Sequence, residues 1–483
     1  MSTTFHRMAA SQQPGKGKVV VGKSEKEKQQ EKKTGVKITA AIFFDGTGNN
    51  LNNTTQRLIA QKKIAAAGLT NTGSYQRYGH DKDKGASYQS FYSNVALLSL
   101  MNTKTKLANR EVSVYIEGIG TEDNQGDDTY GNAYGSGPTG VTSKVNREKR
   151  LGALTDGGIE KLVKKVRKAY DKGNEYIEQL KIHVYGFSRG AAAARHFIAR
   201  KAAMCQKLGV DSKVVEYQFV GLFDTVSSFE PEGKTGTDTF GVYATAASHD
   251  FDNDVKELGL ALYPSRDQIK KVVHLVAGNE YRANFSSTTI KSAIAGGVGY
   301  ELVLPGAHSH IGGGYGEIEK ESRELDGAIH MQELIAAGWY SKQHIQVKQE
   351  LVPDYRESMS PRYRTIYFGV RTLSNKFQYI PLAAMIQLAA KHGTAFSESL
   401  LREGISLAVP TDLGSVKAGL VKYAIDNDGA HRKEFRFRSM VETHDVRRKY
   451  LHRSDSIGLF ADGRKGMNTR KKNGKPTRQT IDG

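Results

Sequence analysis

The sequence predicts an α/β fold with a mostly parallel sheet and helices on both of its faces. Short apolar runs alternate with stretches that have helical spacing, and several of these runs end in glycine turns. Apolar residues make up 38% of the 483 residues, which is enough for a substantial core. The longest uncharged, mostly apolar run is residues 377–390, whereas a membrane-spanning helix needs about 20 residues. The chain is therefore expected to be globular and to have no transmembrane segment.

Six apolar runs are expected to form the sheet, because they are short, partly β-branched and bounded by polar or glycine-rich segments. Apolar residues at i, i+3, i+4 and i+7 predict a helix over residues 159–170. A second helix is expected over 189–208, and a third, with a proline in its first turn, over 380–391. The predicted strands are residues 37–44, 112–117, 181–185, 217–223, 271–276 and 300–304.

Composition divides the chain into four parts. Residues 1–35 are rich in Lys, Gln and Glu and are expected to be a disordered basic arm. Residues 36–315 hold all six predicted strands and form the expected core, with a polar, glycine-rich insertion at about 58–92. Residues 316–430 are expected to be mainly helical, and their apolar helix is a candidate lid, membrane contact or core element. Residues 431–483 are expected to be a basic tail.

Positive charge is concentrated in the first and last of these parts. The net charge is +19, and residues 1–35 and 431–483 together carry 14 of these charges. An enzyme of nucleic acids more often has its charge along a folded groove, so no nucleic-acid partner is expected. Basic ends suit a diffuse anionic surface, such as acidic phospholipid headgroups. Solvated segments with no partner account for them equally well.

Cysteine usage points to a reducing compartment. The chain has one cysteine, Cys205, which excludes an internal disulfide framework and a CxxC metal site. The first 30 residues contain no apolar stretch of signal-peptide length. We therefore expect a protein that is made in the cytoplasm and carries no cleaved signal peptide.

The clearest chemical motif is GFSRG at residues 186–190, a G-x-S-x-G between a predicted strand and a predicted helix. A nucleophile elbow requires this context, because the glycines allow a strained turn that holds the serine above the sheet. The backbone N–H of Arg189 is expected to face the oxyanion, aided by the positive end of the following helix. Ser188 is thus the expected nucleophile, and the alternative is an ordinary Gly-Ser turn.

A serine nucleophile needs a base, which is itself oriented by an acid. In an α/β-hydrolase the acid and then the histidine follow the serine in the chain. Asp224 ends the predicted strand 217–223, so its carboxylate is expected at the same sheet edge as the elbow. His308 and His310 lie in a glycine-rich loop after the last predicted strand, and the residues alone leave them nearly equal. A metal site built on this H-x-H pair is a weak alternative.

The turn after the first predicted strand is a further candidate for this chemistry. The backbone N–H of Gly46 or of Thr47 is expected to be the second oxyanion donor. Asp45 is the second choice for the acid, because it precedes the serine in the chain. Neither a metal nor an organic cofactor is expected.

Seven motifs occur in order: FFDGTGNN (43–50), SNV (93–95), YIEGIGT (115–121), YGFSRGAAAAR (185–195), VGLFDTV (220–226), NEYRANF (279–285) and GAHSHIGGGY (306–315). Together they resemble the catalytic domain of the first family of type VI secretion lipase effectors, over about residues 36–315. The resemblance implies an α/β-hydrolase that cleaves acyl esters of phospholipids in rival bacteria. It implies Ser188 as nucleophile, Asp224 as orienting acid and His308 as base.

The same resemblance implies how the protein works in the cell. A secretion-spike protein and a cognate immunity protein are its expected partners. Its expected destination is the periplasm of a target cell, where contact with the phospholipid substrate is peripheral. The chain departs from the family pattern HSDVGGG, because His310 stands where the family has an acid. We interpret that acid as structural, so His310 is not expected to abolish catalysis.

Two other functions fit the same residues. One is an esterase that acts on soluble esters. The other is a non-catalytic module in which the hydrolase fold survives as a scaffold and the basic tails bind the partner. An intact set of serine, aspartate and histidine favours the enzyme over the scaffold.

Overall fold

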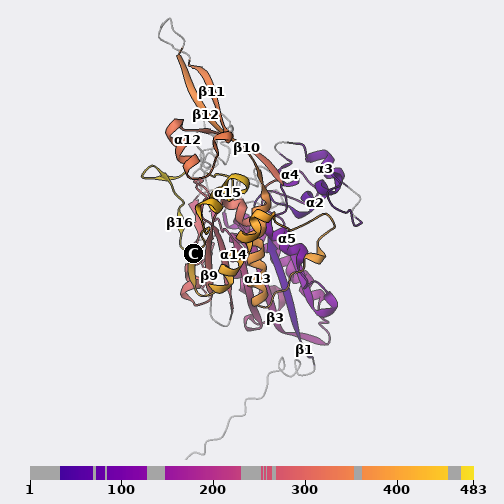
Figure 1. The fold of residues 1–483 in the computed structure, drawn as a ribbon. Helices are drawn as coiled ribbons and strands as arrows, with labels where there is room; N and C mark the ends of the chain where they lie inside the picture. Colours follow the sequence, from indigo (N-terminus) through magenta and orange to yellow (C-terminus); the bar gives the residue numbers. More distant parts are fainter. Residues whose placement is uncertain are drawn as a thin grey trace, which may run out of the picture.

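The computed structural model describes residues 33–454 and 469–483, except for 69–71, 82–83, 128–146, 230–251, 254, 257, 264–267 and 353–361. Its centre is a seven-stranded sheet in which all neighbouring strands are parallel (Figure 1). The predicted α/β fold with a mostly parallel sheet is confirmed, and all six predicted strands are present. In spatial order the strands are β13 (His431–Glu434), β9 (Gly299–Leu304), β7 (Val272–Ala277), β4 (Val215–Phe223), β3 (Glu175–Phe187), β1 (Thr34–Phe44) and β2 (Glu111–Ile116).

Helices cover both faces of this sheet. Because successive residues of a strand point to opposite faces, each strand contributes side chains to two separate cores. Phe43 and Tyr185 belong to the core on one face, and Ile42 and Val184 belong to the core on the other. Figure 1 shows two of the covering helices, α13 and α14, in front of the sheet. The first face packs against α5 (Asn94–Met101), α11 (His308–Gly312), α13 (Tyr379–Lys391) and α14 (Thr411–Asp426). The second packs against α7 (Arg147–Lys168), α8 (Arg189–Ala199), α9 (Lys201–Leu208) and α10 (Lys291–Ala295).

The helices after the elbow differ in detail from the prediction. The single helix expected over 189–208 is two helices, α8 and α9, which meet at Arg200. Cys205 is buried in α9 and forms no disulfide. The helix expected over 159–170 corresponds to the second half of α7, which begins at Arg147 and ends at Lys168, two residues before the predicted end.

The polar insertion folds into short helices beside the sheet. Its first residues belong to α2, and the rest includes α3 and α4. Buried polar side chains hold it together: Asn53 donates to the Ser87 hydroxyl at 3.0 Å, and the Ser87 N–H donates to the Asp127 carboxylate at 2.7 Å. These pairs satisfy the polar groups of a segment with few apolar residues. The helices are α2 (Leu51–Ala60), α3 (Gly73–Tyr78) and α4 (Ala86–Gln89).

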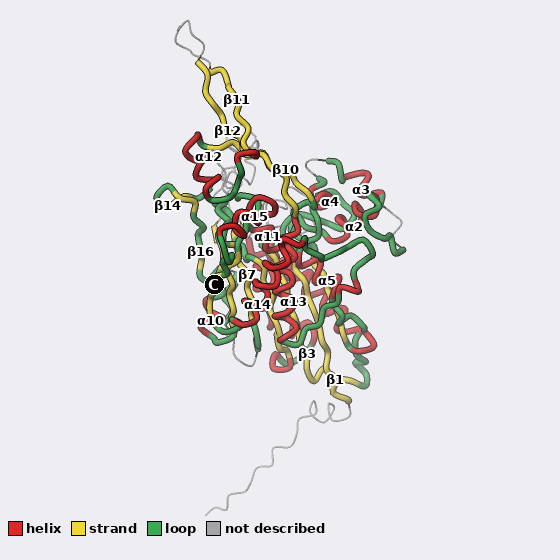
Figure 2. The backbone as a smooth tube through the Cα atoms, in the orientation of Figure 1, coloured by secondary structure: helices red, strands yellow, loops and turns green. Residues whose placement is uncertain are grey.

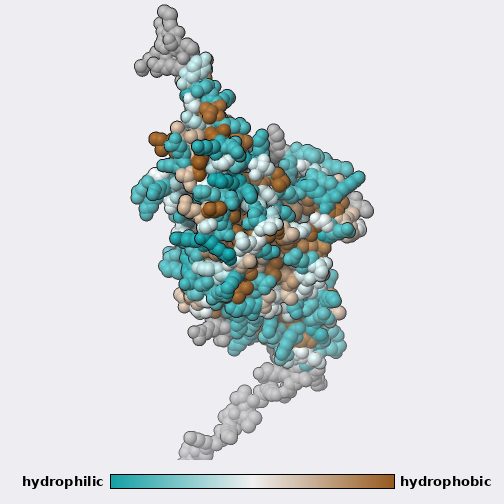
Figure 3. Space-filling model, in the orientation of Figure 1, coloured by the Kyte–Doolittle hydropathy of each residue, from teal (hydrophilic) through white to brown (hydrophobic). Residues whose placement is uncertain are grey.

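Residues 316–430 are expected to be mainly helical, and besides their helices they contain a three-stranded antiparallel sheet that was not predicted, in the order β10-β12-β11. Figure 2 shows β11 and β12 projecting away from the body of the molecule, and Figure 3 shows apolar side chains on this projection. Arg371 is buried at its base and donates to the Glu321 carboxylate and to three backbone carbonyls. The elements here are β10 (Ile318–Leu325), α12 (Gly327–Ala336), β11 (Ile345–Val352) and β12 (Arg362–Ser374).

The part expected to be a basic tail is folded wherever the structure describes it. β13 joins the edge of the central sheet, and β16 pairs in parallel with β8. Both contacts are backbone ladders, which a freely solvated tail does not form. The expected arm, residues 1–35, lies outside the described part apart from the start of β1. The elements involved are α15 (Met440–Tyr450), β14 (Lys471–Lys472), β15 (Lys475–Pro476), β16 (Thr480–Ile481) and β8 (Ser287–Thr288).

Short elements complete the described fold. They are η1 (Leu107–Asn109), η2 (Ser212–Val214), η4 (Lys342–His344), η5 (Asn375–Gln378), η6 (Glu398–Leu400), β5 (Ser228–Phe229) and β6 (Asp252–Asn253).

Helix α13 is part of the core. Eight of its thirteen residues are buried, Pro381 and Leu388 among them, and it packs on the same face of the sheet as α5 and α14. Of the three roles expected for this helix, the structure shows core packing, since its apolar side faces protein. None of the described helices is both long enough and apolar enough to cross a bilayer.

The core position of α13 predicts a large effect of truncation. Leu388→Ala should lower the free energy of unfolding by about 2–5 kcal/mol, because it leaves a cavity in a packed core. Val441→Ala is the matched control, since Val441 is 71% exposed and its truncation should cost within about 0.5 kcal/mol. Denaturant titration of both variants measures the difference. Equal effects would show that α13 does not pack as described.

Candidate active site

Ser188 occupies a strained turn between β3 and α8. Its backbone has φ 60° and ψ −131°, a conformation that non-glycine residues rarely adopt. The flanking glycines are required by close packing: a Cβ on Gly190 would lie 2.1 Å from the Asp45 carbonyl oxygen, and one on Gly186 would lie 2.6 Å from the Ala191 Cα. The turn is therefore a nucleophile elbow in its geometry, with α8 pressed against the end of β1.

Backbone hydrogen bonds fix this turn beside the end of β4. The Ser188 N–H donates to the Phe223 carbonyl at 3.0 Å, and the Val226 N–H donates to the Ser188 carbonyl at 3.3 Å. Asp224 lies between these two partners, and its own φ is 44°. The elbow and the predicted acid thus meet at the carboxyl edge of the sheet.

His308 lies against both of these turns. Its Nδ1 is 2.6 Å from Oδ2 of Asp224, and both side chains are buried. The rings of Phe187 and Phe285 pack on the imidazole, with centroid distances of 4.6 Å and 4.9 Å. Phe187 directly precedes Ser188, so this contact brings the elbow next to the imidazole. A proton on Nδ1, donated to Asp224, leaves Nε2 as the basic nitrogen.

His310 has a different set of partners. Its Nδ1 accepts from the Ala307 N–H at 2.8 Å, and its Nε2 lies 3.2 Å from Nδ1 of His452. His452 in turn reaches the Glu319 carboxylate at 3.2 Å. The structure therefore brings His308, and not His310, to the predicted acid. In the described part of the chain, no three His, Cys, Asp or Glu side chains are placed to hold a metal ion.

Asp45 is engaged elsewhere. It accepts from the Gly46 N–H at 2.7 Å, the Ser93 hydroxyl at 2.5 Å and the Tyr115 hydroxyl at 2.6 Å. Burial raises the pKa of Asp45 to about 6, and these hydrogen bonds oppose the shift only in part. Asp45 therefore does not take the place of the triad acid, and it makes no contact with either candidate histidine among the described interactions.

The same contacts distinguish the two candidate oxyanion donors of this turn. The Gly46 N–H donates to the Asp45 carboxylate at 2.7 Å and is therefore engaged in this structure. At Thr47, the Nε of Arg189 donates to the hydroxyl at 2.9 Å. Thr47 and Arg189 thus lie side by side at the elbow.

Three charged residues around His308 received no role from the sequence. Glu280 is fully buried and accepts from the His308 backbone N–H at 3.1 Å. Arg282 donates to the same carboxylate through Nε and Nη2, both at 2.9 Å. Arg478, from the expected tail, donates to Asp224. Glu280 and Arg282 belong to the NEYRANF motif, which is the signal that could have found them, whereas no local pattern marks Arg478.

These charges set the protonation of the site. Burial alone would raise the pKa of Asp224, but Arg478 and the hydrogen bond from His308 outweigh it and hold that pKa well below its usual value. The pKa of Glu280 falls to about 2, because Arg282 outweighs the effect of burial. Burial lowers the pKa of His308, and the Asp224 carboxylate offsets this only in part. A neutral imidazole beside an ionised aspartate is the state that a general base needs.

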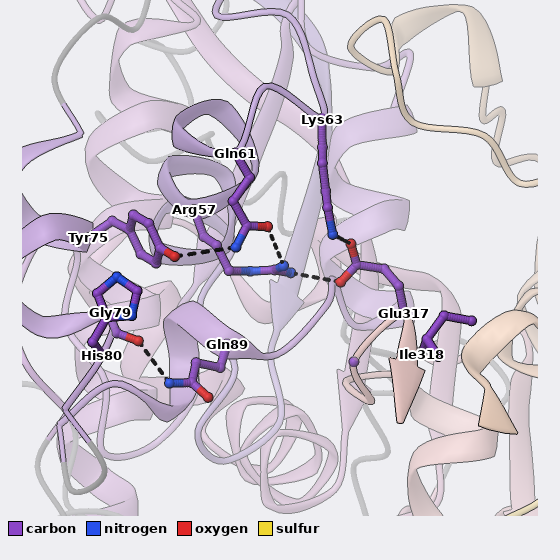
Figure 4. Close-up of a pocket in the computed structure, with 10 residues that line it drawn as sticks. Arg57, Gln61, Lys63, Tyr75, Gly79, His80, Gln89, Glu317 and Ile318 are labelled. Carbon is purple, nitrogen blue, oxygen red and sulfur yellow. Dashed lines mark hydrogen bonds and ion pairs between the residues drawn. The ribbon is translucent and has the colours of Figure 1, made fainter. Parts of the chain in front are cut away.

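A cleft of about 470 Å³ lies elsewhere, between α2, α3 and the residues before β10 (Figure 4). Its two cations are already paired, since Glu317 contacts Arg57 at 3.1 Å and Lys63 at 2.5 Å. None of the predicted site residues lines this cleft. Its lining consists of Arg57, Gln61, Lys63, Tyr75, Gly79, His80, Gln89, Gly316, Glu317 and Ile318.

Comparisons with known proteins identify what this arrangement resembles. The family described as "T6SS, Phospholipase effector Tle1-like, catalytic domain" matches residues 39–212 and 199–339. The solved structure of the Tle1 effector bound to the VgrG spike from the type VI secretion system aligns with 93% of this chain and 94% of that chain, at a TM-score of 0.57 and 22% identity. An uncharacterized protein from Pseudomonas aeruginosa aligns with 88% of this chain and 54% of its own, at a TM-score of 0.39 and 16% identity. No curated protein matches.

The family match includes the elbow, the acid and the histidine, and it spans more than half of the chain. The similarity to the solved effector concerns the fold, which is α/β-hydrolase-like.

The close packing at the elbow predicts that Gly190→Ala is destabilising. The new methyl group would overlap the Asp45 carbonyl, so α8 must shift, at a cost of about 1–3 kcal/mol and with a loss of activity. Gly157→Ala in α7 is the control, because a Cβ there meets no atom within 4 Å and should stabilise the helix by up to about 1 kcal/mol. Thermal unfolding and ester hydrolysis test the pair. A Gly190→Ala protein as stable and active as Gly157→Ala would contradict the elbow geometry.

Proposed function

The chain belongs to the Tle1-like phospholipase effector family of the type VI secretion system, and on this premise we propose that it hydrolyses acyl esters of membrane glycerophospholipids. Ser188 is the proposed nucleophile, His308 the base and Asp224 the orienting acid. One observation carries this proposal: the 2.6 Å contact between Asp224 and His308 at the sheet edge where the strained elbow presents Ser188. The reaction is of the phospholipase A type and releases a fatty acid and a lysophospholipid.

Acylation is the first half of the proposed reaction. The Ser188 Oγ attacks the ester carbonyl carbon while its proton passes to Nε2 of His308. Asp224 keeps the imidazole in one tautomer through Nδ1–H and stabilises the imidazolium that forms. The carbonyl oxygen becomes an oxyanion, for which the backbone N–H groups of Arg189 and Thr47 are the proposed donors. His308 then protonates the departing glycerol oxygen as the carbon–oxygen bond breaks.

Deacylation repeats these steps with water as the nucleophile. His308 takes a proton from the water, the hydroxide attacks the acyl-Ser188 ester, and the same donors hold the second oxyanion. Collapse of this intermediate releases the fatty acid and returns the proton to Ser188. Every proton moves through the imidazole, and the described residues supply all the acid–base groups that these steps use.

Delivery by the secretion system follows from the family. The solved Tle1 effector is bound to a VgrG spike, and we propose a spike protein as the delivery partner of this chain as well. The proposed destination is the periplasm of a target bacterium, with a cognate immunity protein protecting the producing cell. Contact with the bilayer is proposed to be peripheral, through basic residues and anionic headgroups.

The two alternative functions predict different experimental outcomes. An esterase of soluble esters would hydrolyse short-chain esters in solution and leave membranes unchanged. A non-catalytic module would be unaffected by loss of the serine hydroxyl. The ion-paired, buried surroundings of Asp224 and His308 favour an enzyme, because a scaffold gains nothing from a neutral histidine held beside a buried carboxylate.

Ser188→Ala tests the proposed function. It should lower hydrolysis by about 10⁴-fold or more, because the members of a triad act as a unit. Lipid mass spectrometry of vesicles measures lysophospholipid, and a short-chain p-nitrophenyl ester measures the soluble reaction. His310→Gln is the control from the same loop and should keep activity within about tenfold. Residual Ser188→Ala activity above a tenth of wild type would rule out this nucleophile.

The acid limb of the pH profile should reflect His308. Catalysis requires the neutral imidazole of His308, and burial lowers the pKa of this imidazole below 6.5. We therefore expect kcat/KM to fall as the pH falls and to reach half its maximum below pH 6.5. Asp45 also titrates near pH 6, so Asp45→Asn is the control and should leave this limb in place. A midpoint above pH 6.5, or a limb that Asp45→Asn removes, would contradict the assignment.

A further inference from the structure

Arg478 reaches the proposed catalytic acid from a distant part of the chain. Its Nη1 donates to Oδ1 of Asp224 at 2.6 Å and its Nη2 donates to Oδ2 at 2.9 Å. This is a bidentate pair between planar groups, the strongest geometry for a guanidinium and a carboxylate. The Arg478 side chain is only 8% exposed, and the Asp224 side chain is fully buried.

The segment 469–483 holds Arg478 in this position through a backbone ladder. β16 pairs in parallel with β8, and the N–H groups of Ser287 and Thr289 donate to the carbonyls of Gln479 and Ile481, both at 2.9 Å. Arg478 itself donates to the carbonyls of Phe285 at 2.8 Å and Ala277 at 2.9 Å. Phe285 also packs on His308, so the segment is tied to the loop that flanks the imidazole.

Arg478 completes the hydrogen bonding of the Asp224 carboxylate. An ionised carboxylate offers about four acceptor positions. The Ala277 N–H takes one at 2.9 Å, His308 takes one, and Arg478 takes two. With every position filled the carboxylate cannot rotate, and only one direction is open for the imidazole.

Arg478 also balances the charge around the imidazole. The charged groups that act on His308 are Asp224 after β4 and Glu280 and Arg282 after β7, and Arg478 before β16 acts on both of these carboxylates. Two carboxylates and two guanidinium groups therefore surround a neutral ring. Loss of Arg478 leaves one uncompensated negative charge, which favours the protonated imidazolium.

We propose that Arg478 is a positioning residue for the triad acid, so that segment 469–483 completes the active site instead of serving as a free basic tail. The inference rests on the proposed roles of Asp224 and His308. Arg478 touches no substrate and acts by fixing the carboxylate that orients the base. The segment is therefore needed even for a small soluble ester, for which membrane contact is irrelevant.

Three full-length variants test the proposal on a short-chain p-nitrophenyl ester. Arg478→Gln should lower kcat by about 10²-fold with little change in KM, because a misplaced base affects the transition state and not substrate binding. The acid limb of its pH profile should move to higher pH, because loss of the positive charge favours the protonated form of His308. Arg478→Lys keeps the positive charge but cannot form the bidentate pair. Its pH profile should therefore have the acid limb of the wild type, and its kcat should lie between those of Arg478→Gln and wild type. Lys475→Gln removes an exposed charge from the same segment and should behave as wild type.

A spectroscopic readout separates this proposal from the proposed function. The proton between His308 Nδ1 and Asp224 should give a downfield NMR resonance, which Arg478→Gln should shift or broaden and Lys475→Gln should leave unchanged. A wild type that hydrolyses no ester would contradict the proposed function alone. A folded Arg478→Gln protein with wild-type kcat, acid limb and resonance would overturn the role of Arg478. If Arg478→Gln does not fold, a wild-type kcat in Arg478→Lys would overturn the role of the bidentate pair between Arg478 and Asp224.

Discussion

The burial of one carboxylate organises the catalytic end of this molecule. Asp224 is fully buried, and a buried charge is tolerated only when it is paired and its lone pairs are satisfied. Its four donors come from three places: the end of β7, the start of α11, and the segment before β16, which contributes two nitrogen atoms of Arg478. Satisfying this one group therefore requires segments that are far apart in sequence to meet. The position of the imidazole follows from that convergence.

The parallel sheet makes the convergence feasible. All neighbouring strands run the same way, so the turns after β1, β3, β4, β7 and β9 open onto one edge. β1 lies between β2 and β3, so the strand order reverses beside it, and crevices for ligands form at such reversals. The Asp45 turn and the Ser188 elbow flank this reversal. The buried network around Asp45 lies beside this reversal, although it takes no part in the acid–base pair.

Much of this arrangement could be predicted from sequence, and the failures have physical causes. The central strands were recognisable because both their faces are buried and their residues are continuously apolar. Ser188 and Asp224 each follow a predicted strand directly, so the strand pattern was enough to predict that both lie at the carboxyl edge of the sheet. The strands β11 and β12 carry apolar residues at alternate positions, such as Ile345 and Val347, and were missed although this pattern is present. Much of their apolar surface is exposed, as at Val347 and Leu351, so burial in the core did not mark them. The choice between His308 and His310 needed the structure, since both lie in one loop and only their partners differ. Arg478 contacts a residue 254 positions away, and no local pattern encodes such a pair.

The pairing of β16 with β8 has a consequence for the timing of synthesis. Synthesis runs from the N-terminus, and Ser188, Asp224 and His308 all leave the ribosome well before residues 478–481 do. Until those residues have emerged and paired, the Asp224 carboxylate lacks two of its four donors. A nascent chain, or one cut before this segment, therefore holds the whole triad in an unfinished state. Under the proposed roles of Asp224, His308 and Arg478, this order of assembly delays the active form until translation of the segment is complete.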